Sequence, residues 1–219
     1  VAGLILGCLV FGYDAPILAL VFGAGVGGAV WVWPSVAPRV VAVLTGVYLL
    51  CAPVVVQALR ASGLYAQAEA DVPLSWSQRM GYWRHAADWI VIHPARGWGL
   101  DASRMFSPGI QLHPHNGALQ IWLELGIVGV FAVTAFWVLV FLRLGRKARD
   151  PAVVAAAASC TAYLVFGSVS FGVWQEWWLG LGALMATAVT VAARAPAKAA
   201  GELPAPVTRR SSTRAPISE

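Results

Sequence analysis

Charged residues are scarce in this chain, and their scarcity excludes an ordinary soluble domain. Only 11% of the 219 residues are charged, whereas 59% are hydrophobic and the mean hydropathy is +0.70. Soluble domains carry about 25% charged residues. Long runs of Val, Leu, Ala, Gly and Phe contain no charge, as the hydrocarbon core of a bilayer requires. The composition therefore predicts an all-α, polytopic integral membrane protein rather than a soluble helical domain.

Cysteine is also sparse and indicates nothing about redox chemistry. Cys8, Cys51 and Cys160 all lie in apolar runs, far apart in sequence, where a thiol behaves as a small hydrophobe. The first residues lack the basic segment that begins a signal peptide. Because the sequence opens inside an apolar run, we expect this chain to be the C-terminal part of a longer protein.

Six apolar segments are candidate membrane spans. Residues 1–13 are shorter than the roughly 20 residues that a span needs, so we expect a truncated helix there. The others are 16–33, 40–59, 127–142, 152–169 and 179–193. This divides the chain into three spans within 1–59, a polar loop over 60–121 and three spans within 122–193. Residues 194–219, rich in Pro, Ala and Arg, are expected to be a disordered cytoplasmic tail.

The distribution of Lys and Arg predicts the orientation in the membrane. Basic residues are enriched in cytoplasmic loops. If the cluster at 143–149 is cytoplasmic, alternation places Arg39 and the tail there too, which gives ten basic residues inside against five in the 60–121 loop. We therefore expect a multi-pass protein of the bacterial inner membrane with this loop in the periplasm. The net charge of +5 then reflects topology, and no nucleic-acid binding is expected.

The polar loop is where chemistry is expected, because it holds all four histidines and five arginines. Residues 75–78 fit a capping box, and helical spacing of apolar residues predicts an amphipathic helix over 76–92 at the membrane surface. Arg79 and Arg84 flank its apolar stripe. Arginine matches phosphate with a bidentate fork, which makes Arg79 a candidate phosphate ligand. The alternative is that Arg79 reaches lipid headgroups or pairs with Asp88.

A second helix is predicted directly after the last two histidines. Asn116 is a good N-cap, and with Gln120 and Glu124, spaced at i, i+4 and i+8, it forms one polar stripe on an otherwise apolar helix. Gly126 is predicted to end this helix, and Gly129 to allow close packing where the next span begins.

The two histidines before this helix have different expected settings. Pro114 forces His113 into extended geometry. His115 precedes the positive end of the helix, which disfavours imidazolium and attracts anions. This suits a neutral histidine that acts as a base beside a pyrophosphate. Two alternatives are a hydrogen-bonded interface residue and a metal site shared with His85 or His93, although the spacing matches no zinc pattern and no metal is expected.

Several short motifs occur together in this chain. They are His115-Asn116 followed by Gly126-x-x-Gly129, the turn Pro94-x-x-Gly97-x-Gly99, Arg79 near the head of a loop helix, and Phe171-Gly172-x-Trp174-Gln175 before the last span. The combination resembles the bacterial O-antigen ligase and O-antigen polymerase superfamily. The resemblance covers about residues 75–178.

The resemblance implies an activity and site residues. Members transfer a glycan from undecaprenyl pyrophosphate at the periplasmic face, with inversion and without a metal or cofactor. The acceptor is a glycolipid, the lipid A-core of lipopolysaccharide, in ligases and a second lipid-linked glycan in polymerases. Carried over, His115 would be the catalytic base and Arg79 one phosphate ligand. Further candidate substrate-binding residues of the same loop and helix are Asn116, Arg84, His113 and Glu124.

One departure from the family and one rival function bear on this interpretation. Members place a further arginine at the start of a membrane helix upstream of the loop, and no residue here matches, since Arg39 is on the other side. We therefore expect this fragment alone to be inactive. The rival is a transporter or scaffold subunit of polysaccharide export, but the spans within 16–33, 40–56 and 152–167 have essentially no ionisable groups, which counts against transport.

Overall fold

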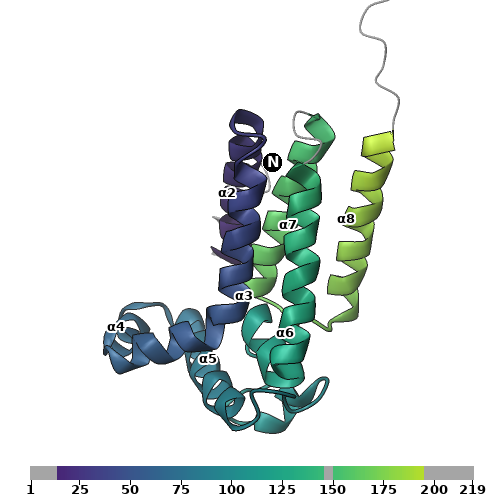
Figure 1. Ribbon diagram of the computed structural model, residues 1–219. Helices are drawn as coiled ribbons and strands as arrows, with labels where there is room; N and C mark the ends of the chain where they lie inside the picture. Colours follow the sequence, from purple (N-terminus) through teal and green to yellow (C-terminus); the bar gives the residue numbers. More distant parts are fainter. Residues whose placement is uncertain (1–13, 146–149, 195–219) are drawn as a thin grey trace, which may run out of the picture.

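The computed structural model describes residues 14–145 and 150–194, and every regular element in these ranges is a helix. The elements are α2 (Asp14–Val32), α3 (Ala37–Ala61), α4 (Leu64–Asp71), α5 (Leu74–Ile92), the 3-10 helix η1 (Ala102–Phe106), α6 (Gly117–Leu144), α7 (Pro151–Val169) and α8 (Glu176–Arg194) (Figure 1). The all-α prediction is confirmed. The expected first span within 1–13, most of the basic cluster and the tail after 194 lie outside the described residues.

Four of these helices, α2, α3, α6 and α7, are long and apolar enough to cross a membrane, and α8 adds a shorter apolar stretch over Glu176–Val191. Their outer surfaces expose large apolar side chains such as Val43, Val54 and Phe136, each about 60% exposed or more (64%, 66% and 59%). A water-soluble protein rarely exposes so many, whereas lipid solvates them. The protein is therefore a multi-pass membrane protein.

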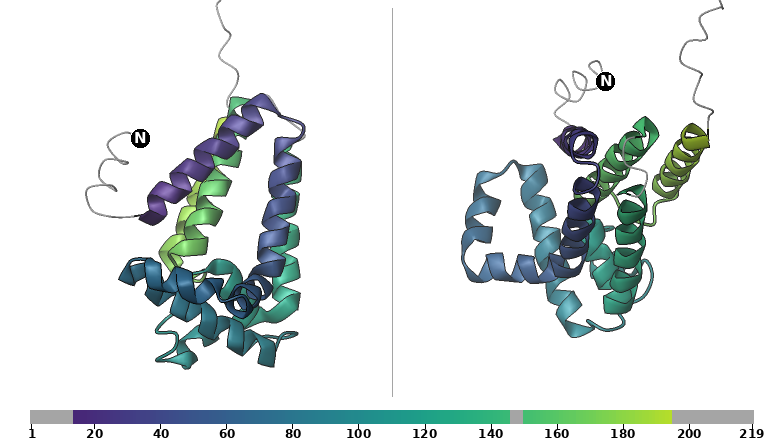
Figure 2. Two further views of the ribbon diagram at one scale, coloured as in Figure 1. Left: turned by 90° about the vertical axis from the view of Figure 1, so that its left-hand side faces the viewer. Right: turned by 45° about the horizontal axis from the view of Figure 1, so that its top comes forward.

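The membrane helices pack as two close pairs, α2 along α7 and α3 along α6. Figure 2 shows α2 crossing in front of α7 and α3 running beside α6. Small residues allow the first pair to approach: a Cβ added at Gly23 would lie 2.8 Å from the carbonyl oxygen of Ala158, and one at Gly27 would lie 3.2 Å from the Ala158 Cβ. Small residues four positions apart commonly allow membrane helices to pack closely.

The polar part of the chain lies at one end of the bundle. Helix α3 ends and α6 begins at this end, so residues 62–116, here called the loop domain, fold together below the membrane helices in Figure 1. The connection between α7 and α8, residues 170–175, lies at the same end and is here called the α7–α8 loop. Near this end, the Trp122 indole of α6 donates to the Leu49 carbonyl of α3 at 2.8 Å, which connects the two helices.

Helix α5 is the main element of the loop domain. The predicted helix over 76–92 is confirmed, and Met80 and Ile90 on its expected apolar stripe are buried. The predicted capping box is wrong, because α5 begins at Leu74 and no side chain caps it. Pro73 precedes the first turn with φ −55°, a value that its ring fixes near the helical one, so the helix starts before Ser75.

Candidate functional site

The first turns of α6 are buried and fixed by polar side chains. As predicted, Asn116 is the N-cap, and its side-chain oxygen accepts from the backbone N–H of Leu119 at 3.0 Å. The same oxygen accepts from the Tyr48 hydroxyl of α3 at 3.2 Å. One turn later, the side-chain oxygen of Gln120 accepts from the Val173 N–H at 2.9 Å. The start of α6 is thus held between α3 and the α7–α8 loop.

Glu124, the last member of the predicted polar stripe, has a carboxylate with 0% exposure. Its oxygens accept from the Asp101 N–H at 2.9 Å, from the Ser103 hydroxyl at 2.5 Å, from the Gln120 amide at 3.1 Å and from the Trp174 indole. A buried carboxylate with this many donors is stable in place. The structure therefore places Glu124 beneath the site, where it holds η1 and the α7–α8 loop onto α6.

Gly126 interrupts α6 with φ 60° and ψ −162°, so two helices meet at this residue. Such a break leaves carbonyl and N–H groups without helical partners. The Pro94-x-x-Gly97-x-Gly99 turn supplies hydrogen-bond partners for these groups. Three backbone hydrogen bonds connect the two segments: Trp98 N–H to Leu123 C=O at 2.9 Å, Gly99 N–H to Glu124 C=O at 2.8 Å, and Ile127 N–H to Pro94 C=O at 2.9 Å.

The glycines of the two motifs are needed at this joint. A Cβ at Gly97 would lie 2.5 Å from the Glu124 carbonyl oxygen, and one at Gly126 would lie 2.5 Å from the Ala95 carbonyl oxygen. Both glycines have positive φ, 66° and 60°, which side chains rarely allow. The two sequence motifs are therefore complementary halves of one contact, here called the Gly97–Gly126 joint.

His115 lies at the surface of this framework, partly exposed and with φ 52°. Its Nδ1 is hydrogen-bonded to the Ser170 carbonyl oxygen of the α7–α8 loop. A carbonyl can only accept, so Nδ1 carries the proton and Nε2 keeps a free lone pair. Tyr82 of α5 stacks on the imidazole with ring centroids 6.0 Å apart and planes 19° apart.

Burial lowers the pKa of His115 below the usual 6.5, and the positive charge of Arg79 lowers it further, while the bond to Ser170 acts in the opposite direction. His115 is therefore neutral near pH 7. A neutral imidazole with a fixed Nδ1–H and a free Nε2 is the form that can accept a proton from a substrate.

His113 is in contact with His115, with ring centroids 4.3 Å apart, but its environment differs. Only 8% of His113 is exposed, and a Cβ at Gly172 would lie 2.9 Å from its ring. Burial, followed by the charges of His115 and Arg104, lowers the pKa of His113 to about 4. This histidine stays neutral at any ordinary pH, and the α7–α8 loop covers it.

Arg79 precedes Tyr82 by one turn of α5 and is partly buried. Burial lowers the pKa of Arg79, and the nearby Asp14 partly offsets this. The guanidinium lies 5.0 Å from the centre of the Trp76 ring, and the Trp76 indole donates to Asp14 at 3.0 Å. In the part of the chain that the structure describes, no carboxylate lies within salt-bridge distance of Arg79. A partly desolvated cation without a paired anion suits an anionic ligand.

Three other arginines, one at the end of α3 and two in the loop domain, form ion pairs with acids of the loop domain. These pairs are Arg60–Asp88 at 2.5 Å, Arg84–Glu69 at 3.1 Å and Arg104–Asp101 at 2.8 Å. The alternative pairing of Arg79 with Asp88 is therefore wrong. Arg84 follows Tyr82 by two residues, on the other side of α5, so the structure does not bring it to His115.

The four histidines do not form a metal-binding group. Within residues 14–145 and 150–194, no group of three or more His, Cys, Asp or Glu side chains could hold a metal ion. The ring of His85 packs against Gly109, and that of His93 lies 4.3 Å from the Trp98 ring.

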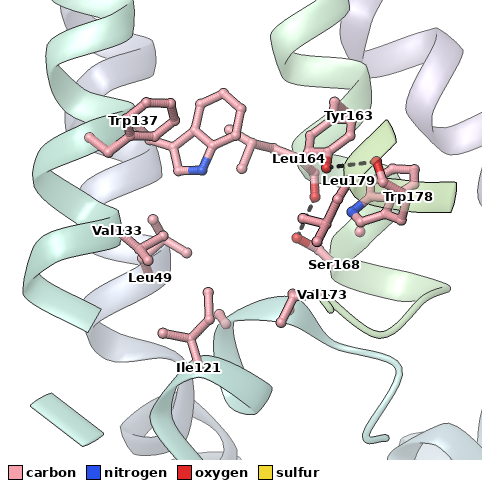
Figure 3. Close-up of a pocket in the computed structure, with 14 residues that line it drawn as sticks. Leu49, Ile121, Val133, Trp137, Tyr163, Leu164, Ser168, Val173, Trp178 and Leu179 are labelled. Carbon is pink, nitrogen blue, oxygen red and sulfur yellow. Dashed lines mark hydrogen bonds between the residues drawn. The ribbon is translucent and has the colours of Figure 1, made fainter. Parts of the chain in front are cut away.

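An apolar pocket of about 230 Å³ adjoins the start of α6 on the membrane side. Figure 3 shows Leu49, Val133 and Trp137 on one side of it, Trp178 on the other, and Ile121 below. Gly117, which directly follows Asn116, also lines it. The pocket thus connects the interior of the membrane bundle with the segment that carries His115.

A family model and curated relatives match this chain. The family model described as O-antigen ligase matches residues 1–134, which include the whole loop domain and the Gly97–Gly126 joint. The chain belongs to the O-antigen ligase family. No solved structure matches it.

Curated members of the ligase family are similar over most of this chain. A protein named "Putative polysaccharide ligase" from Rickettsia prowazekii is 28% identical over 183 residues, 74% of this chain and 44% of the relative. One of the same name from Rickettsia conorii is 27% identical over 186 residues, 75% of this chain and 44% of the relative. The chain therefore spans less than half the length of these relatives.

Two residues in contact with His115 of this ligase-family chain, Tyr82 and Ser170, could not be found from sequence. The segment 171–175 carries a motif, but nothing in its sequence indicates that it covers His113 and bonds to Glu124. Tyr82 stands between Arg79 and Arg84 without a signal of its own. Only the folded chain brings α5 and the α7–α8 loop to the two sides of His115.

Proposed function

We propose that the protein transfers a glycan from undecaprenyl pyrophosphate to an acceptor sugar at the periplasmic face of the bacterial inner membrane, with inversion, and that His115 is the base. The observation that carries the proposal is the state of His115: neutral, partly exposed, and oriented by Ser170 so that Nε2 is free. Membership of the O-antigen ligase family supports the same class of reaction.

In the proposed reaction, the acceptor hydroxyl gives its proton to Nε2 of His115 while its oxygen attacks the anomeric carbon of the donor sugar. The bond from that carbon to the pyrophosphate oxygen breaks, and lipid pyrophosphate leaves with the electron pair. Pyrophosphate is a good leaving group, so the protein must supply positioning, a base and positive charge. Arg79, which has no carboxylate partner among the described residues and is within electrostatic range of His115, supplies positive charge without a metal.

The apolar pocket of Figure 3 supports a lipid-linked donor. It begins at Gly117, two residues after His115, and continues between α3, α6, α7 and α8. A prenyl chain in this pocket would leave its pyrophosphate at the boundary between the bundle and the loop domain. His115 precedes Gly117 by two residues and so lies at this boundary.

The test uses cells in which the whole protein carries one substitution. His115→Ala should reduce glycan transfer at least about 100-fold, the usual contribution of a general base, with unchanged amounts of protein in the membrane. Leu112→Ala, a change at a 55% exposed side chain of the same segment, should leave transfer intact. Normal surface polysaccharide in the His115→Ala cells would refute the assignment.

A polymerase that extends lipid-linked repeats would share this donor and base. The two are distinguished by what accumulates when the protein is absent: full-length glycans on the lipid carrier indicate a ligase, and single repeats indicate a polymerase. Release of the lipid pyrophosphate by the purified protein with donor and acceptor alone would exclude a transporter or scaffold function.

A further inference from the structure

The loop domain contains a second pocket, to which the reaction described above assigns no role. It is open and has a volume of about 540 Å³, within the range of sites that hold small molecules. The pocket is lined by His85 and Trp89 of α5, by Trp98, and by residues 105–109. Neither His113 nor His115 lines it, so it is separate from the proposed reaction centre.

Three aromatic rings form one wall of this pocket. Trp89 and Trp98 meet edge to face with centroids 5.3 Å apart, and Phe106 lies 4.7 Å from Trp89 and 5.4 Å from Trp98. The Trp98 indole donates to the Trp89 carbonyl at 2.9 Å, which fixes the pair. All three rings are only partly buried, although they lie in the polar part of the protein.

Polar groups lie beside these rings. The imidazole of His85 and the hydroxyl of Ser107 line the same pocket, and both residues are exposed. A rigid aromatic surface bordered by a few hydrogen-bonding groups fits an amphipathic ligand with an apolar face and a polar edge. A sugar ring has this form, since its C–H groups can stack on an aromatic face while its hydroxyls bond to the polar side chains. The pocket in Figure 3, by contrast, is lined almost entirely by apolar groups.

Helix α5 connects the pocket with the reaction centre. Arg79, Tyr82, His85 and Trp89 lie on successive turns of one side of the helix, since their spacing spans about 120° around its axis. Tyr82 stacks on His115, and Trp89 lines the pocket. With a rise of about 1.5 Å per residue, the two residues are separated by about 10 Å along the axis. A saccharide whose end is at His115 can therefore extend along α5 into the pocket.

We propose that this pocket binds sugar residues of the glycan that reacts at His115, beyond the sugar that forms the new bond. The inference rests on the proposed function for the identity of the ligand as a glycan. The pocket provides a binding site for the glycan, formed by Trp89, Trp98, Phe106 and His85. Binding there would position the reacting sugar at His115.

Calorimetric titration of the purified whole protein in detergent tests the proposal. One arm uses oligosaccharides released by mild acid from the surface polysaccharide of the same cells, which represent the donor glycan. The other arm uses the core oligosaccharide of their lipopolysaccharide, which represents the acceptor. One of the two should bind to the unsubstituted protein, and the arm that binds identifies which substrate the pocket holds.

Two matched substitutions locate the binding. Met105 lines the pocket and Leu100 does not, and both side chains are 66% exposed in the same loop. Met105→Glu should weaken oligosaccharide binding at least tenfold, because it places a charge at the aromatic wall. Leu100→Glu should leave binding unchanged. His85→Ala, at an exposed side chain, should also weaken binding because it removes a hydrogen-bonding group.

The outcomes separate this inference from the proposed reaction. Absence of binding in both arms, or equal binding by the unsubstituted protein and Met105→Glu, would refute the proposal that this pocket binds the glycan. His115→Ala should bind the oligosaccharide normally while it fails to transfer. If His115→Ala retained transfer while Met105→Glu still lost binding, the pocket would stand and the assignment of the base would fail.

Discussion

At the scale of single residues, two histidines two positions apart have different environments, and the difference comes from what covers them. The α7–α8 loop covers His113, which is 8% exposed, with Gly172 against its ring. The same loop supplies only a carbonyl, that of Ser170, to His115. Family motifs indicated His115 from sequence, but the tautomer that leaves Nε2 free depends on a contact with a residue 55 positions away.

The pH dependence of transfer should report this environment. The proposed base His115 would act in its neutral form, and burial lowers its pKa. Activity should therefore persist below pH 6.5 and be lost only as the pH falls through the lowered pKa. Arg79 also lowers that pKa. Arg79→Gln should therefore move the acid limb of the pH–rate profile to higher pH, in addition to reducing the rate.

Arg84→Gln is the control for this shift. Arg84 pairs with Glu69 on the other side of α5 and is not among the groups that shift the pKa of His115, so the acid limb should stay in place. The profile is measured as initial rate against pH with membranes of each variant. An acid limb at the same pH in Arg79→Gln and the unsubstituted protein would contradict the electrostatic contact between Arg79 and His115.

At the scale of secondary-structure elements, α6 shows what sequence patterns could and could not predict. Asn116 as N-cap, the stripe to Glu124 and the break at Gly126 were visible, since each depends on residues within a few turns. The segment that bonds to α6 at this break could not be predicted from the sequence. The turn at Pro94 to Gly99 bonds to α6 through backbone groups, and such bonds leave no periodicity in the sequence.

The start of α5 illustrates the opposite error. Ser75 and Gln78 have the spacing of a capping box, but Pro73 has the φ of a helix already and directs the chain into the first turn at Leu74. A strong local preference of one residue therefore overrode a two-residue pattern. For this reason, the sequence predicted that a helix is present here but did not predict the residue at which it begins.

The Gly97–Gly126 joint yields a prediction about stability. Gly126→Ala should destabilise the protein by about 1–3 kcal/mol, the cost of forcing a side chain into an unfavourable backbone region, because its Cβ would also overlap the Ala95 carbonyl. Gly81→Ala, in α5, meets nothing within 4 Å and should stabilise by about 0.5–1 kcal/mol. Thermal unfolding in detergent measures both, and equal melting temperatures would count against a tightly packed joint.

At the scale of the whole molecule, every segment of the candidate site lies at one end of the bundle (Figure 1). Composition could predict a membrane bundle, because long apolar runs without charge are characteristic of segments that cross a bilayer. It could not predict that α2 packs on α7 rather than on α3, since small residues such as Gly23 occur in several helices. The pairing of α2 with α7 is visible only in the folded bundle.

The orientation expected from the basic residues can be tested with two matched cysteines. Ser75 lies at the end that carries the site, Ser35 lies in the connection between α2 and α3 at the opposite end, and both are exposed. In a protein whose native cysteines are replaced, Ser75→Cys should react with a membrane-impermeant thiol reagent added to cells with a permeabilised outer membrane. Ser35→Cys should react only after lysis. The reverse pattern would place the site in the cytoplasm.

The break at Gly126 also divides α6 into two parts that respond differently to the membrane. Residues 127–144 form the part of α6 whose tilt adjusts to the thickness of the surrounding bilayer, whereas residues 117–125 are held by the loop domain through the joint and through Glu124. A change of tilt in residues 127–144 therefore acts on the Ile127–Pro94 hydrogen bond of the joint before it reaches the segment next to His115. The joint thus lies between the candidate site and the part of α6 on which differences in acyl-chain length among the surrounding lipids act.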